Sequence, residues 1–110
     1  MSAEESHVQL ANELRARVMD SGVLSRDVRE RAVDLGAGLG EPAAGSVEAL
    51  AAQIGEASFR VTDDQVAAAY DAVGSEKETF EVVMAASVGA GLRRWDVAMH
   101  AIEEASVAAS

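Results

Sequence analysis

The sequence predicts an all-α fold, a compact helical domain of about five helices. Apolar residues recur at spacings of three and four along most of the chain, which is the period of a helical face. Capping patterns precede several of these runs, and no segment alternates with the period of a strand. The length of 110 residues suits a single domain. A composition that is 49% hydrophobic but only 4% aromatic favours a core of closely approaching helices.

The first two predicted helices make up an N-terminal helical arm over residues 1–35. The first helix begins with a capping pattern at Ser2 and Glu5 and ends at Gly22. The second helix is capped by Ser25. The side chains expected to face inward are Val8, Ala11, Leu14 and Val18 in the first helix and Val28, Ala32 and Leu35 in the second.

A glycine-rich loop over residues 36–42 separates this arm from a predicted helical core, residues 43–107. Its glycine spacing does not match a dinucleotide fingerprint, and no strand precedes it, so the loop is interpreted as a flexible connector. The third helix is expected over about 43–59, and the fourth opens with the capping box Thr62–Gln65 and ends near Gly74. The third helix is expected to bury Val47, Leu50, Ala51 and Ile54.

The longest predicted helix opens with a third capping box, Ser75–Glu78, and runs to about Ala105. Two glycines, Gly89 and Gly91, lie in its middle, where each costs roughly 1 kcal/mol relative to alanine. Close approach of another helix would explain them, and a kink is the alternative. The inner stripe is expected to consist of Phe80, Val83, Met84, Ser87, Gly91, Trp95, Ala98 and Ile102.

The charge of the chain is strongly acidic, with 19 acidic residues, 9 basic residues and a formal net charge of −10. This balance argues against nucleic acid and anionic membrane surfaces as partners, because both attract basic patches. The acidic N-terminus lacks a secretory signal, so we expect a cytoplasmic protein. Absence of cysteine excludes thiol chemistry, disulfides and thiolate metal sites, and we expect no cofactor.

Asp96, His100 and Glu103 lie at i, i+4 and i+7 and therefore share one face of the long helix. Such a row can ligate a divalent metal or exchange protons, whereas an exposed polar face explains it without a function. Arg93 and Arg94 stand beside Trp95, a combination typical of partner contacts. Ion pairs with nearby acidic residues are the alternative for the two arginines.

Three stretches, residues 61–66, 75–83 and 85–94, resemble the carboxymuconolactone decarboxylase and alkylhydroperoxidase D-like family. In that family a capped helix is followed by a long helix rich in alanine and glycine. The resemblance covers about Ser46 to Ile102. It implies an all-helical alkylhydroperoxidase D-like fold that assembles through its long helix, commonly into trimers or hexamers.

The redox members of this family carry a Cys-x-x-Cys pair followed by a histidine. The resemblance puts the two cysteine positions near Gly45 and Glu48 and the histidine position near Ala52. None of these residues is a thiol or an imidazole, so the chain is not a thiol peroxidase. The resemblance therefore carries over a fold and an assembly, but not the redox site.

These observations favour a non-catalytic homo-oligomeric assembly or partner-binding module, with a basic or neutral protein as a second kind of partner. Its expected interface residues are Phe80, Gly89, Gly91, Arg94 and Trp95. One alternative is a thiol-independent enzyme that performs acid–base chemistry on a small acid or lactone. Its candidate residues are Glu48, Asp96 and His100, with Arg60, Arg93 or Arg94 lining the pocket. The other alternative is a metal carrier that uses Asp96, His100 and Glu103.

Overall fold

The protein consists of helices joined by short connections. A computed structural model describes residues 3–109, and no strand occurs among them, so the predicted all-α class is confirmed. The elements are α1 (Ala3–Asp20), α2 (Arg26–Gly36), α3 (Ser46–Ala57), the short 3-10 helix η1 (Ser58–Arg60), α4 (Asp63–Val73) and α5 (Glu76–Ala109).

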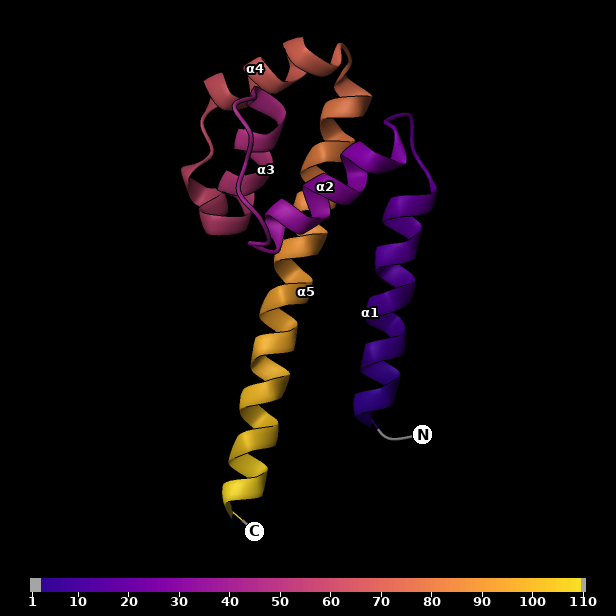
Figure 1. The fold of residues 1–110 in the computed structure, drawn as a ribbon, viewed down its shortest axis with the longest axis vertical. Coiled ribbons are helices and arrows are strands. Elements are labelled where there is room, and N and C mark those ends of the chain that lie inside the picture. Colours follow the sequence, from indigo (N-terminus) through magenta and orange to yellow (C-terminus); the bar gives the residue numbers. More distant parts are fainter. Residues whose placement is uncertain (1–2, 110) are drawn as a thin grey trace.

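The shorter helices α2, α3 and α4 gather around the N-terminal half of α5, as Figure 1 shows. The C-terminal half of α5 extends away from them, and α1 runs antiparallel beside it, so that both chain ends lie at the same end of the molecule. The dimensions are 54 × 27 × 20 Å, and the radius of gyration is 15.6 Å. A globular chain of about 100 residues has a radius near 13 Å. The molecule is therefore a small core from which a two-helix arm projects.

Most of the predicted helix boundaries agree with the structure. Ser25 caps α2, and Thr62 forms the predicted reciprocal box with Gln65 at the start of α4. Gly74 ends α4 with a φ of 89°, a left-handed conformation that favours glycine. Ser75 accepts a hydrogen bond from the backbone N–H of Glu78 at the start of α5. The cap predicted at Ser2 lies outside the described residues.

The third and fifth helices differ from their predicted lengths. α3 begins at Ser46, three residues later than predicted, because the backbone at Gly45 is extended and the N–H of Ala43 donates to the Glu48 carboxylate. Its last predicted turn forms η1 instead. α5 continues to Ala109, beyond the expected end near Ala105.

The core is built from small and medium aliphatic side chains, with Leu50 and Val82 as the largest that are fully buried. The inward-facing residues predicted for α3 and α2 are buried or half-buried there. Ala32, Val33 and Leu35 of α2 belong to this core, so the expected division of the chain after residue 35 is displaced. Only α1 is an arm to the N-terminal side of the core.

Backbones of three helices touch at glycine positions. A Cβ added to Gly89 of α5 would lie 2.0 Å from the carbonyl oxygen of Val33 in α2. One added to Gly36 of α2 would lie 2.1 Å from the carbonyl oxygen of Ala86, and one added to Gly55 of α3 would lie 2.4 Å from that of Gly36. These distances leave no room for a side chain. The close helix approach predicted for Gly89 is therefore confirmed.

Most of the predicted inner stripe of α5 is exposed in the single chain, although Val83 packs against the core. Phe80 and Ile102 are each 59% exposed, Trp95 is 43% exposed, and Gly91 has no neighbouring atom within 4 Å of an added Cβ. Small side chains face α2 and α3 instead because the backbones approach so closely. The buried residues of α5 are Thr79, Val82, Ala85, Ala86, Gly89, Ala90 and Leu92.

Substitution of Gly89 by alanine is expected to destabilise the fold by about 1–3 kcal/mol or more, because a methyl group would overlap the backbone of α2. Gly91→Ala is the matched control on the same helix. It is expected to leave the fold as stable or to add up to about 1 kcal/mol through helix propensity. Urea unfolding followed by circular dichroism measures both changes, and equal stabilities would contradict the close contact.

Candidate functional site

A cavity of about 560 Å³ opens between α2, α3, α4 and the start of α5. Its walls are mainly apolar and include Val28, Leu35, Val47 and Ala51. Four charged residues also line it, namely Asp27, Arg31, Glu48 and Glu78. This combination of an apolar interior and a few polar groups is typical of small-molecule sites.

Glu48 and Arg31 form an ion pair in this cavity. The Arg31 Nε lies 2.8 Å from the Glu48 Oε1, and both side chains are half-buried. The same carboxylate oxygen accepts a hydrogen bond of 3.1 Å from the backbone N–H of Ala43. Arg31 also donates to the carbonyl oxygen of Glu41. The pair therefore fixes the loop before α3 to the side of α2.

The pKa of Glu48 is lowered. The hydrogen bond from the Ala43 N–H is the main cause, and the hydrogen bond from Arg31 adds to it. Glu48 also lies in the first turn of α3, where a negative charge is favoured by the helix dipole. The group is ionised at neutral pH, so it can bind a cation or accept a proton but is a poor proton donor.

Other residues that the sequence proposed for chemistry do not join this cavity. His100 lies on the projecting part of α5, and its Nε2 is 3.1 Å from the Oε1 of Glu104. Asp96 and Glu103 are exposed on the same helix. Among residues 3–109 no group of three or more histidine, aspartate or glutamate side chains is arranged to hold a metal ion. Asp96, His100 and Glu103 are therefore not brought together as a cluster, and His100 pairs with Glu104 instead.

The candidate arginines are used at the ends of helices. Arg93 donates to the carbonyl oxygen of Ala37 at 2.8 Å, and Arg94 donates to that of Gly55 at 3.4 Å. Positive charge is favoured at the C-terminal ends of helices, where carbonyls lack partners within the helix. Arg60 lies over the ring of Phe59, 5.7 Å from its centroid. None of these arginines lines the Glu48 cavity. The cation at Glu48 is instead Arg31, which the sequence did not single out because the pair joins separate helices.

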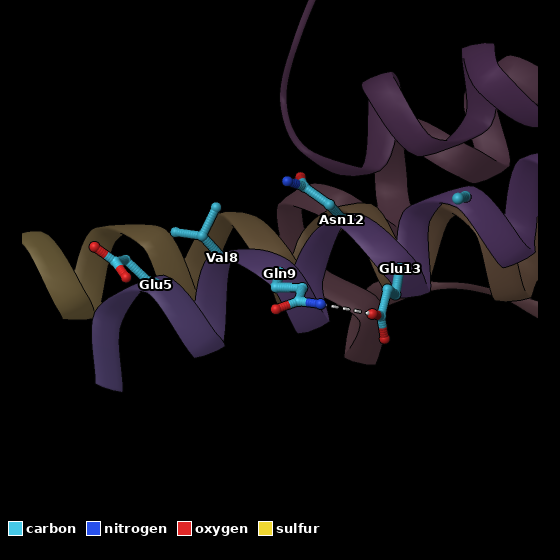
Figure 2. Close-up of a pocket in the computed structure, with 6 residues that line it drawn as sticks. Glu5, Val8, Gln9, Asn12 and Glu13 are labelled. Carbon is cyan, nitrogen blue, oxygen red and sulfur yellow. Dashed lines mark hydrogen bonds between the residues drawn. The ribbon is translucent and has the colours of Figure 1, made fainter. Parts of the chain in front are cut away.

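A shallow hollow on the outer side of α1 carries no convincing site. Figure 2 shows Glu5, Val8, Gln9, Asn12 and Glu13 lining it, and all its lining residues come from this one helix. The Gln9 amide donates to the Glu13 carboxylate at 3.4 Å, as neighbouring turns of a helix allow. A surface formed by a single helix does not enclose a ligand.

The projecting helices present an exposed apolar surface, which we call the arm face. Arg17 and Val18 of α1 line a groove together with Phe80 and Met84 of α5. Exposed residues at spacings of three and four share one side of each helix, and we group them with this groove as the arm face. Its members are Leu10 and Leu14 of α1 and Phe80, Met84, Ser87, Gly91, Trp95, Ala98 and Ile102 of α5.

Four of the five predicted interface residues are exposed on α5, whereas Gly89 is buried within the chain. Phe80, Gly91 and Trp95 belong to the arm face, and Arg94 lies beside it. Gly89 contacts α2 and cannot meet another molecule without loss of that contact. The Trp95 ring packs edge-to-face on His7 of α1, with 4.9 Å between centroids, so it anchors α1 while one side stays open.

Comparison of the chain with protein-family models, curated proteins and solved structures finds no match. In the described part of the chain no helix combines the length and the apolar character needed to cross a membrane. The cavity at Glu48 and the arm face are the features of the described chain that bear on its function.

Replacement of Glu48 by glutamine is expected to remove a stabilising charge interaction above the ordinary glutamate pKa of 4.5. Because the folded-state pKa is lowered, that stabilisation is present above this value and is lost as the pH falls through the folded-state pKa. The wild type should therefore be more stable than the variant near neutral pH, and the difference should shrink in acid. Urea unfolding across the pH range measures it.

Glu56→Gln is the control for this comparison, because it removes the same charge from an exposed position on the same helix. It gives the baseline for the loss of one negative charge from α3. An identical pH profile for the two variants would show that the contacts of Glu48 with Arg31 and Ala43 contribute nothing.

Proposed function

We propose that this protein is a cysteine-free relative of the alkylhydroperoxidase D-like family that acts in the cytoplasm as a helical self-assembly module. A second copy of the chain covers the arm face. The observation that carries the proposal is the inverted distribution of side-chain size on α5. Small residues face the core, whereas Phe80, Trp95 and Ile102 are exposed along the projecting helix.

The exposed apolar area supplies a driving force for association. Burial of apolar surface contributes about 25 cal/mol per Å², or roughly 1.5–3 kcal/mol for a large side chain that becomes fully buried. Contiguous apolar patches on a monomer commonly mark contacts with other molecules. The C-terminal half of α5 lacks cover from α2, α3 and α4, as Figure 1 shows. Phe80 and Met84 in the N-terminal half are exposed as well, so the apolar area extends over both halves of the helix.

The chemistry of the stripe favours a second copy as the occupant. From Phe80 to Ile102 the members of the stripe on α5 are all uncharged, although the chain carries a net charge of −10. Large side chains at Trp95 and Ile102 alternate with small ones at Gly91 and Ala98. A large residue of one copy can therefore fill the space above a small residue of another, as helix packing requires. The family resemblance implies a trimer or hexamer.

A thiol-independent enzyme is the second candidate function. It is favoured by Glu48, an ionised carboxylate at the wall of a mainly apolar cavity. Arg31 lies beside it as the one cation among the lining residues and would hold the carboxylate of a small acid or the carbonyl of a lactone. Acid–base catalysis at this cavity would then require the Glu48 carboxylate. If the wild type is active and Glu48→Gln keeps the same activity, Glu48 is not the catalytic group.

A charge placed in the arm face is expected to dissociate the assembly. Ile102→Glu introduces a carboxylate where the proposed contact is apolar, so its desolvation opposes association. Val97→Glu is a matched control, because Val97 is 60% exposed on the same helix but lies away from the stripe. Light scattering coupled to size-exclusion chromatography should give an oligomeric mass for the wild type and the control and a monomeric mass for Ile102→Glu. A monomeric wild type at micromolar concentration would contradict the proposal.

Salt is expected to strengthen self-association. Two copies that each carry a net charge of −10 repel one another, while the proposed contact itself is uncharged. The screening length falls from about 30 Å at 0.01 M salt to about 10 Å at 0.1 M, so added salt weakens the repulsion. Sedimentation equilibrium at low and moderate salt measures the dissociation constant. Weaker association at higher salt would indicate that complementary charges hold the copies together instead.

A further inference from the structure

A second cavity, separate from that of Glu48, lies where the end of α1, the connection to α2 and the start of α5 meet. Its volume is about 420 Å³. Arg17, Arg29 and Lys77 line it, and Glu81 is the one carboxylate among its lining residues. Three of the 9 basic residues of an acidic chain therefore surround one cavity.

Arg29 is buried with only part of its hydrogen-bonding capacity used. Its side chain donates to the carbonyl oxygens of Leu24 and Met19, and the residue is 6% exposed. The Nε is buried without a hydrogen-bond partner. Among the described residues no carboxylate lies within ion-pair distance of Arg29. The nearest carboxylate is that of Glu81, because its Oε1 and the Nη1 of Arg29 both lie within 3 Å of the position that a Cβ on Gly22 would take. Glu81 is therefore the counter-ion of Arg29, and the charges of Arg17 and Lys77 remain for an anion in the cavity.

The carboxylate of Glu81 is already engaged by the backbone. Its Oε1 accepts a hydrogen bond from the N–H of Val23, and its Oε2 accepts one from the N–H of Leu24 at 2.9 Å. These bonds hold the connection between α1 and α2. Glu81 thus neutralises one of the three positive charges that line the cavity, so the lining keeps a net positive charge.

The remaining lining of the cavity is largely apolar. Val18 of α1 and Phe80 and Met84 of α5 line it, and the last two are substantially exposed. A charged group near the cations would therefore adjoin a surface that favours hydrocarbon. The volume lies at the lower end of the range of about 300–1,000 Å³ that is usual for ligand pockets.

We propose that this cavity binds an amphipathic carboxylate, with its charged group near Arg17, Arg29 and Lys77 and its apolar body on Phe80 and Met84. Arg17 and Lys77 are exposed and can reach the charged group, whereas the guanidinium of Arg29 is held by backbone carbonyls. Phe80 and Met84 also belong to the arm face, so a second copy seated there and the carboxylate would compete for this groove.

Phenylbutyrate is a suitable probe, and phenylbutanol supplies the same ring and chain without the charge. Isothermal titration calorimetry on the full chain, with and without the substitution Ile102→Glu that is expected to give a monomer, measures the affinity of each. The double variant Arg17→Ala and Lys77→Ala is expected to bind phenylbutyrate at least about tenfold more weakly, because charge-assisted contacts are lost. Arg60→Ala removes an exposed arginine outside the cavity and should bind like the wild type.

Arg29→Met is expected to weaken both the site and the connection between α1 and α2, because Arg29 donates to the carbonyl oxygens of Met19 and Leu24. The decisive comparison therefore uses the double variant of Arg17 and Lys77, which are exposed. Circular dichroism establishes that the double variant keeps its helical content. Preference for phenylbutyrate over phenylbutanol that is lost in the double variant supports the site. Equal binding of the two probes, unchanged binding by the double variant, or no binding of phenylbutyrate by the wild type overturns it.

Discussion

Backbone contact between α2 and its neighbours α5 and α3 is the constraint on which the rest of the structure depends. At Gly89, Gly36 and Gly55 the helices approach until the carbonyl of one fills the place of a side chain on the other. Dispersion contacts accumulate over such surfaces because many atoms lie at close range. The same approach excludes large side chains from the inner side of α5. The core therefore consists of residues such as Ala85 and Ala86, and no aromatic ring is buried in it.

Exclusion of bulk from the core explains where the large side chains of α5 go. Phe80, Trp95 and Ile102 form the arm face because the inner side of the helix has no space for them. The core thus specifies a single arrangement of α2, α3 and α5 but buries little apolar area for a chain of this length. Association through the arm face would bury apolar surface that the single chain leaves exposed. It would also stabilise the fold, because a partner that binds only the folded state shifts the folding equilibrium toward it.

Local signals in the sequence predicted most of the fold. The caps at Ser25 and Thr62 and the stop at Gly74 depend on neighbouring residues, and these elements were predicted correctly. The inner side of α5 was not predicted correctly. Large and small apolar residues lie on adjacent sides of that helix, and hydrophobicity alone does not say which side faces the core. The choice depends on the glycines of α2 and α3, which are distant in the chain. Glu48 was recognised as a candidate, whereas its partner Arg31 and the buried Arg29 depend on how separate helices meet.

The capping of helix ends by remote arginines has a consequence for folding cooperativity. α2 and α3 have no basic residue in their own last turns, and their terminal carbonyls accept hydrogen bonds from Arg93 and Arg94 of α5. These donors lie 56 and 39 residues further along the chain. Local bonds also act at both ends, because the N–H groups of Gly38 and Leu39 donate to carbonyls of α2 and the Gln53 amide donates to the carbonyl oxygen of Ala57 in α3. Each end nevertheless loses its remote partner when the middle of α5 separates from it. The core accordingly gains and loses its helices together, while the distal turns of α5 can open without exposing it.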